Sequence, residues 1–272
     1  MTRALPTIGS TEPWSGGSVT GHAVCVLAPN PSIMTLDGTN TWLIGDASSG
    51  RLLVVDPGPL AGGHLQAIRS ALAERSCRAG GILLSHGHAD HSAGAGELAQ
   101  QLRCGVRALD PRYRLGEEGL GDGDVVDDAG VVLRVVATPG HSADSLSFLL
   151  EPDRALLTGD TVLGRGTTVV AHPDGRLDDY LRSLRRLQDL AAATDATRVL
   201  PGHGPALPDP AGLLEAYLEH RWARLAQVRD AVGAGARTAE DVVALVYAGI
   251  PREAIPAALL SVRAQLEYLR QG

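Results

Sequence analysis

The stretch His86-Gly-His88-Ala-Asp90-His91 places four side chains that can bind a metal within six residues. It directly follows Gly81–Ser85, a short apolar run that we expect to be a buried strand. Extended residues two apart point the same way, so His86 and His88 can face one metal, while Asp90 and His91 in the following turn can face a second. The simpler interpretation is a polar loop, but unpaired His and Asp this dense are costly beside a core strand.

Three more candidate ligands each follow an apolar run and stand in a turn rich in Gly and Pro. They are His141 in Thr-Pro-Gly-His, Asp160 in Thr-Gly-Asp and His203 in Pro-Gly-His-Gly. Taken singly, each is typical of an ordinary turn. Together with the first cluster they make five His and two Asp, enough for two metal ions. His and carboxylate ligands suit zinc, with iron or manganese as alternatives.

The order HxHxDH, TPGH, TGD and PGHG resembles that of the metallo-β-lactamase-fold hydrolases, over about residues 19–210. Two further segments, Asn30–Leu43 and Leu163–Thr168, are similar to the β-lactamase-like protein 2 subgroup, whose members carry a small C-terminal winged-helix-like domain. The fold that this resemblance implies is an αββα sandwich, an α/β architecture. It would hold two metals at one edge, between the two sheets.

The resemblance also implies a role for each matching residue. One metal would be held by three histidines, the other by two histidines and an aspartate, and one further aspartate would bridge them. Asp56, in the turn Asp-Pro-Gly, would orient a ligand from outside the set. The first metal site would be His86, His88 and His141; the second would be Asp90, His91 and His203; the bridge would be Asp160.

Two such metals predict hydrolysis. Ions about 3.5–4 Å apart share a water and lower its pKa toward neutrality. The metal-bridging hydroxide would attack a carbonyl or phosphoryl centre, and Asp90 would act as the catalytic residue that accepts the nucleophile's proton. The sequence therefore predicts a dinuclear metal-dependent hydrolase with two zinc ions.

The elements that must position these residues alternate between strands and helices, which argues for a layered α/β domain. Apolar runs and their punctuation predict the following strands: 19–27, 41–45, 52–56, 81–85, 106–109, 131–137, 146–150, 155–157 and 198–200. Helical spacing of apolar residues predicts helices at 64–75, 92–103, 178–192, 211–232 and 255–270, and Thr238-Ala-Glu-Asp241 has the form of a capping box opening another.

Composition divides the chain into three parts. Residues 1–18 are rich in Gly, Ser, Thr and Pro and lack the apolar stretch of a signal peptide, so we expect a flexible N-terminal tail. The catalytic domain would span residues 19–210, because three prolines in 205–210 mark a boundary. Residues 211–272 would form the helical, winged-helix-like domain.

Charge and cysteine content limit the kinds of partner and the cellular compartment that we expect for this protein. The net charge is -7 with His neutral, all 24 basic residues are Arg, and residues 211–272 carry as many acids as Arg, so we expect no binding to duplex DNA. Three widely spaced cysteines and no membrane-length apolar run fit a cytoplasmic protein without a membrane partner. The oligomeric state stays open.

A few other residues are candidates for contact with the substrate. Arg165 follows the proposed bridging Asp160 and is the substrate-binding candidate. Trp42 and Tyr113 are candidates for stacking on bases. Residues better explained as surface or satisfied groups are His22, His64, His172, His220 and the helical run Arg182, Arg185 and Arg186.

The favoured substrate is single-stranded RNA, cut at a phosphodiester, because the subgroup resemblance points to an endoribonuclease. The alternative is a thioesterase acting on acyl carriers or small thioesters, which the same fold supports. A β-lactamase loses weight because the chain has no Lys to hold a substrate carboxylate. A non-enzymatic interaction module is the remaining hypothesis.

Overall fold

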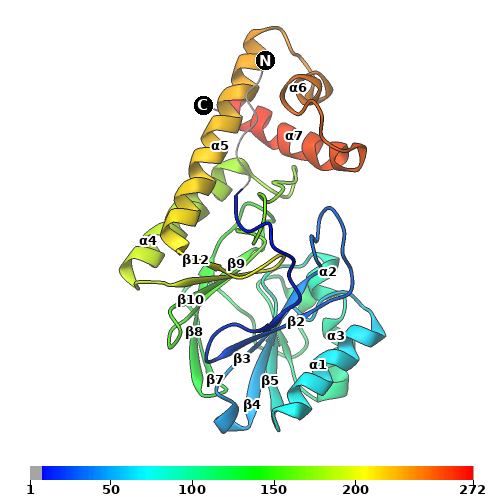
Figure 1. Ribbon diagram of the computed structural model, residues 1–272, viewed down its shortest axis with the longest axis vertical. Coiled ribbons are helices and arrows are strands. Elements are labelled where there is room, and N and C mark those ends of the chain that lie inside the picture. Colours follow the sequence, from blue (N-terminus) through cyan, green and yellow to red (C-terminus); the bar gives the residue numbers. More distant parts are fainter. Residues whose placement is uncertain (1–7, 272) are drawn as a thin grey trace.

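Two six-stranded sheets form the centre of the protein (Figure 1). The computed structural model describes residues 8–271. The first sheet runs in the order β1 (Gly17–Ser18), β2 (Ala23–Leu27), β3 (Asn40–Ile44), β4 (Arg51–Val55), β5 (Arg78–Leu83) and β6 (Val106–Arg107). The second runs in the order β12 (Leu207–Pro208), β11 (Arg198–Pro201), β10 (Ala155–Gly159), β9 (Leu146–Leu150), β8 (Val131–Ala137) and β7 (Val125–Asp128).

Helices cover the outer face of each sheet, which makes four layers. Along β4, Leu53 and Val55 enter the core between the sheets, whereas Leu52 and Val54 pack outward against α1 (Gly62–Glu74) and α3 (Ala95–Leu102). On β9, Leu149 packs outward with α4 (Leu177–Ala193). Side chains alternate because successive residues of a strand face opposite sides of the sheet. The predicted αββα sandwich is confirmed.

The parallel strand pairs bring the candidate ligands to one edge. β4 pairs in parallel with β5, and β10 with β11. The chain leaves β5 toward His86, β10 at Asp160, and β11 toward His203, so these residues follow the carboxyl ends of their strands. Ligands bind at such ends in α/β sheets, because the loops there converge.

The C-terminal helices continue from this body. α5 (Pro210–Gly233), yellow to orange in Figure 1, begins at the capping Asp209. It is followed by α6 (Ala239–Val246) and α7 (Ile255–Gln271), in orange and red. The first half of α5 shares a core with α4, while its end packs with α6 and α7 in a separate cluster. The helix that begins where we expected a domain boundary thus joins both cores. The predicted capping box at Thr238 and Asp241 is present.

The N-terminal segment departs from our expectation of a flexible tail over residues 1–18. Residues 1–7 of that tail lie outside the described part of the chain. From Ile8 on, however, the segment packs against the rest of the protein. Ile8 is buried in the hydrophobic cluster that α4 forms with its neighbours, and Gly9 forms an antiparallel β-bridge with Arg165. Trp14 Nε1 donates to Asn40 Oδ1 at 2.7 Å. The buried Ile8 side chain and these long-range hydrogen bonds fix the segment after residue 7, although its composition is typical of a flexible loop.

Other local predictions need smaller corrections. The single helix expected at 92–103 is two, α2 (Ala89–Ser92) and α3, so Asp90 and His91 stand on a helical turn. The break falls at Gly94, whose N–H donates to Gly58 O at 3.0 Å; a Cβ there would lie 2.9 Å from Leu65 Cδ2. Within the described residues, no helix has the length and apolar character needed to span a membrane.

Candidate metal centre

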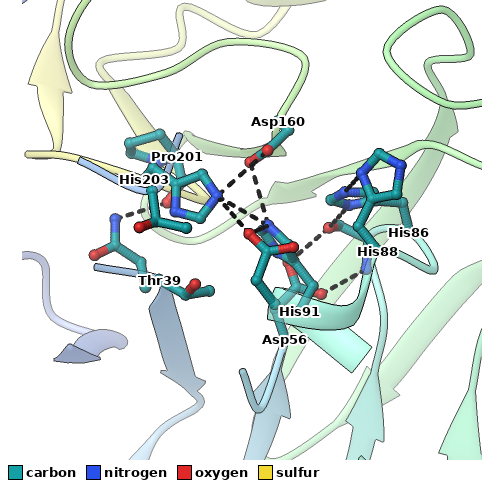
Figure 2. Close-up of polar contacts among 12 residues, drawn as sticks. Thr39, Asp56, His86, His88, His91, Asp160, Pro201 and His203 are labelled. Atoms are coloured by element: carbon teal, nitrogen blue, oxygen red, sulfur yellow. Dashed lines mark hydrogen bonds and ion pairs between the residues drawn. The ribbon is translucent and has the colours of Figure 1, made fainter. Parts of the chain in front are cut away.

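All seven predicted ligand residues meet at the edge described above. Figure 2 labels five of them, which are His86, His88, His91, Asp160 and His203. His86 and His88 leave the end of β5, while Asp90 and His91 stand on α2. His141 comes from the β8–β9 connection, Asp160 follows β10 and His203 follows β11. Their donor atoms fall into three overlapping groups that could each hold a metal ion: His86, His88 and His141; Asp90, His91 and His203; and His86, His91 and Asp160.

The first group consists of three imidazoles. His86 Nε2 and His141 Nε2 each lie 3.0 Å from His88 Nδ1. A tetrahedral zinc with bonds of about 2.0–2.1 Å has ligand atoms about 3.3 Å apart, close to this spacing. The three nitrogens therefore fit around one ion after a small adjustment.

The second group combines imidazole and carboxylate. His91 Nε2 lies 3.2 Å from His203 Nε2, and His203 Nε2 lies 3.2 Å from Asp90 Oδ2. Asp160 completes the set from above in Figure 2, with Oδ1 3.4 Å from His91 Nε2 and Oδ2 3.3 Å from His203 Nε2. Asp160 Oδ2 also lies 3.7 Å from His141 Nε2, a member of the first group. Asp160 is thus within reach of both groups, as a bridging carboxylate must be.

Four of the imidazoles are oriented by the bond at their other nitrogen. His91 Nδ1 faces Asp56 Oδ2 at 3.0 Å, His141 Nδ1 faces Val169 O at 2.7 Å and His203 Nδ1 faces Gly38 O at 3.2 Å. These oxygens can only accept, so each Nδ1 carries a proton and each Nε2 is the nitrogen that faces the centre. His86 Nδ1 contacts Ser85 Oγ at 3.0 Å in the same sense.

Asp56 organises two of these contacts. Its Oδ2 also accepts from Ser85 Oγ at 2.6 Å, and its Oδ1 accepts from Ser85 N at 2.7 Å. Because Ser85 Oγ donates to Asp56, its lone pairs are left for His86 Nδ1. Asp56 therefore orients His91 directly and His86 through Ser85.

The electrostatics of the two groups differ. Burial lowers the pKa of His86 well below its usual value, with His91 adding to the effect, and burial also lowers that of His141. Burial opposes the charged form of His203 too, but Asp160 outweighs it and raises the pKa of His203 to about 9. Burial would raise the pKa of Asp160, yet His203 and His91 hold it well below the usual range. His86 and His141 of the first group are thus neutral imidazoles, whereas the second group is charged, with the Asp160 carboxylate ionised beside His203.

These features meet the requirements of a dinuclear site. Metals bind deprotonated imidazole nitrogen and carboxylate oxygen, and both kinds of donor atom face inward here. Burial favours neutral imidazole, but Asp160 raises the pKa of His91 well above its usual value and that of His203 to about 9, so a bound divalent ion would displace a proton from Nε2 of each. Asp160 Oδ1 is buried and has no hydrogen-bond partner among residues 8–271, which a metal bond would supply. The residues present therefore fit a pair of divalent ions.

Glycine allows the loops to approach this closely. A Cβ on Gly202 would lie 2.5 Å from Asp160 Oδ1 and 2.7 Å from His91 Cε1. A Cβ on Gly140 would lie 2.3 Å from Tyr180 Cα. The Gly before each ligand His in Pro-Gly-His is thus needed for close packing.

A cleft of 470 Å³ opens over the centre. One side of it is formed by Met34 and Thr35, which lie between β2 and β3, and by Val169 and Ala171. The C-terminal region also contributes to the lining, through Glu253, Pro256, Ala257 and Leu260. Sequence reasoning missed this wall, because a helical apolar pattern does not tell which outside surface the helix meets.

Several predicted contacts lie elsewhere. Arg165 donates from Nε to Ser10 O at 2.8 Å and from Nη2 to Glu12 O at 2.7 Å, and it pairs with Asp37 at 3.1 Å. Its guanidinium therefore holds the N-terminal segment, and we do not retain Arg165 as a substrate contact. Trp42 is buried and donates to Pro201 O at 3.0 Å, so it cannot stack on a base.

Tyr113 is placed differently from both. A Cβ on Gly87 would lie 2.1 Å from Tyr113 Cε2, so its ring lies directly against the loop that carries His86 and His88. Tyr113 is half-buried and does not line the cleft. It packs the ligand loop from outside.

The other histidines and the Arg run do not join the centre. His22 pairs with Asp153 at 2.5 Å, and His64 is buried with Nε2 2.8 Å from Thr41 Oγ1. Arg182 and Arg186 form ion pairs at the surface with Asp178, Asp179 and Asp122. His172 and His220 line other cavities. The interpretation of the Arg run as a solvated helix face agrees with these contacts.

Comparison with known proteins gives the same family. A family model described as the metallo-beta-lactamase superfamily matches residues 34–203, and one described as the beta-lactamase associated winged helix domain matches residues 238–271. A beta-lactamase-like protein 2 homolog from Caenorhabditis elegans is 33% identical over 276 residues, which cover 97% of this chain and 89% of that protein.

Two further proteins extend the comparison. An atrochrysone carboxyl ACP thioesterase from Aspergillus fumigatus is 35% identical over 215 residues, 76% of this chain and 64% of that protein. The crystal structure of a beta-lactamase domain protein from Burkholderia ambifaria superposes with a TM-score of 0.80 at 25% identity, covering 96% of this chain and 90% of that one. The chain therefore belongs to the metallo-β-lactamase superfamily, a superfamily of hydrolases, and carries the associated C-terminal winged-helix domain.

Proposed function

We propose that the protein is a metal-dependent thioesterase, with two zinc ions held by His86, His88, Asp90, His91, His141, Asp160 and His203. Two such ions, when bound, lower the pKa of a water molecule and polarise the electrophile. The protein's own task is to hold the ligands, to receive a proton and to select the substrate.

The composition of the cleft carries the choice of substrate. Its lining includes the apolar side chains of Met34, Val169, Pro256 and Leu260, and no Arg among the described residues. The one charged side chain that it adds beyond the ligand set is the carboxylate of Glu253. An acyl chain gains by burial against such walls, whereas the chain of a phosphodiester would meet no Arg side chain there beyond the metal ions themselves.

In this proposal, Asp90 accepts the proton of the attacking water. Its side chain is 33% exposed and lines the cleft, whereas that of Asp160 is 11% exposed. Burial would raise the pKa of Asp90, but the hydrogen bond from His203 lowers it, so the group is a carboxylate at neutral pH. We propose this role in addition to its place in the second metal group.

The named relatives support a thioesterase more directly than a nuclease. One relative is named as an acyl-carrier-protein thioesterase. RNA cleavage, which we favoured from the sequence, remains a prediction drawn from the subgroup resemblance. A β-lactam has the same difficulty as RNA, because the cleft lining offers no Arg side chain to its carboxylate.

The test compares substrates on one zinc-loaded preparation. We expect acyl-pantetheine thioesters of increasing chain length to be hydrolysed, while an unstructured RNA oligonucleotide and a chromogenic β-lactam stay intact. His88→Ala should abolish turnover, whereas His172→Ala, which changes a His outside the ligand groups, should retain it. Cleavage of RNA that depends on His88, with the thioesters left intact, would overturn the proposal in favour of the endoribonuclease.

A further inference from the structure

A second cavity, of 220 Å³, lies between α5 and the C-terminal helices. It adjoins the metal-centre cleft, since Val169 and Ala257 line both. Three basic side chains of α5, His220, Arg221 and Arg224, contribute to its wall, and the described residues that line it include no carboxylate. A cavity with cations on its wall and no internal counter-charge calls for an anion.

The two guanidinium groups have aromatic and carbonyl partners instead of acids. Arg221 is buried, with its guanidinium carbon 4.8 Å from the Tyr180 ring centroid and Nη2 2.5 Å from Thr168 O. The Arg224 guanidinium carbon lies 4.3 Å from the Tyr247 ring centroid, and its Nη1 donates to Gln227 Oε1 at 2.9 Å and to Val246 O at 3.0 Å. Neither Arg forms an ion pair within residues 8–271. The rings cover the faces of the cations, but they do not neutralise them.

Three buried nitrogens of this wall lack a hydrogen-bond partner among the described residues. They are His220 Nδ1, Arg221 Nε and Arg224 Nε. Buried polar atoms are almost always paired with protein, water or ligand, so three orphans around one cavity indicate a missing partner. A water occupies about 30 Å³, so the cavity has room for several waters or for one small anion.

We propose that this cavity is an oxyanion site, which binds a phosphate or carboxylate group beside the metal centre. The planar forks of Arg221 and Arg224 suit the paired oxygens of such groups, and the anion supplies the countercharge that the protein lacks. Burial, and then the two neighbouring guanidiniums, lower the pKa of His220 to about 4. Its imidazole is therefore neutral at pH 7 and adds a hydrogen bond without a third positive charge.

One short segment connects this site with the catalytic centre. Thr168 O accepts from Arg221, and Val169 O accepts from His141 Nδ1 at 2.7 Å. An anion held here would thus lie one peptide away from a metal-ligand contact. The oxyanion could be free phosphate or, resting on the proposed thioesterase function, a phosphate on the thiol arm of the substrate.

Calorimetry with inorganic phosphate on the zinc-loaded protein tests the site. We expect Arg224→Gln to weaken phosphate binding about tenfold or more, because a charge-assisted hydrogen bond is lost. Arg229→Gln, which changes an exposed Arg further along α5, should bind as the wild type does. Any phosphate on the zinc ions is common to these proteins and cancels in the comparison.

A second measurement needs no variant and covers the case in which Arg224→Gln unfolds. The Nε–Hε NMR signals of Arg221 and Arg224 in the wild type should shift saturably with phosphate, while that of Arg229 should not. Unchanged signals at both Arg221 and Arg224, or equal phosphate affinity in folded Arg224→Gln and Arg229→Gln, would overturn the site and leave a water-filled cavity.

Kinetics then distinguish the two sources of the oxyanion. If the substrate carries it, Arg224→Gln should raise KM for an acyl-phosphopantetheine but not for the acyl-pantetheine, with kcat unchanged. If the ligand is free phosphate, both KM values should stay at the wild-type level while phosphate binding is weakened. Should no thioester be hydrolysed at all, the proposed function fails, whereas calorimetry and NMR still decide on the oxyanion site.

Discussion

His91 Nδ1 lies 3.0 Å from Asp56 Oδ2, and the side chains are 0% and 3% exposed. The contact holds the His91 proton on Nδ1 and turns Nε2 toward His203. In Asp56→Asn, an amide N–H would face this nitrogen and move the proton to Nε2, where it blocks a metal bond. Zinc affinity should fall about 10–100-fold, as measured by chelator competition.

The matched control for this change is Asp153→Asn. Asp153 also faces a His nitrogen, 2.5 Å from His22 Nδ1, but it belongs to none of the metal-ligand groups. Its replacement should leave zinc affinity unchanged. Wild-type affinity in Asp56→Asn would show that His91 needs no carboxylate to orient it.

Asp160→Ala should disturb both metal sites. The carboxylate lies 3.3 Å from His203 Nε2 and 3.7 Å from His141 Nε2, one residue from each group. Elemental analysis should give close to two zinc ions per chain for the wild type and one or none for the variant, with turnover lost. Asp144→Ala, outside the ligand groups, serves as control. Two metals with full activity in Asp160→Ala would refute the bridging assignment.

Arg165→Gln should destabilise the fold and spare the reaction. It removes charge-assisted bonds to Ser10 O and Glu12 O, so we expect a loss of about 1–3 kcal/mol in the free energy of unfolding. Arg182→Gln, an exposed residue of α4, should change it by less than about 0.5 kcal/mol. A large rise in KM at unchanged stability would instead restore Arg165 as a substrate contact.

The buried His64 should make the fold sensitive to acid. Burial lowers its pKa from 6.5 to about 4, so between these values the unfolded chain binds a proton that the folded chain does not. The contribution of neutral His64 to the free energy of unfolding is therefore fully present above pH 6.5. It decreases by about 3 kcal/mol as the pH falls toward 4. Denaturant titrations of wild type and His64→Gln should show the smaller pH dependence in the variant. Parallel pH profiles would contradict this.

The metal centre was predictable because its information is local. A buried strand followed at once by His86, His88, Asp90 and His91 predicts a ligand cluster at a strand end. The turns before His141, Asp160 and His203 repeat the same arrangement. Strand alternation and helical spacing likewise predict the layers, since each depends on residues close along the chain.

The local pattern failed where long-range packing decides. Arg165 stands beside a ligand turn in the sequence, but its guanidinium is used by Ser10 and Glu12. Trp42 was predicted to stack on bases, but in the folded protein its side chain is buried between the sheets. In both cases the partner is distant in sequence, so no spacing rule could reveal it.

By itself, then, the sequence determined the cluster of candidate metal ligands, the family and the sandwich, because each is carried by short motifs and by the periodicity of strands and helices. Only the tertiary structure decided what lies around the centre. It placed Glu253 and Leu260 of the C-terminal region over the cleft and gathered His220, Arg221 and Arg224 around a second cavity. The surroundings of the substrate depend on which face of each C-terminal helix packs against which loop. This packing is determined by the burial of apolar side chains that are distant in the sequence, and no local pattern encodes it.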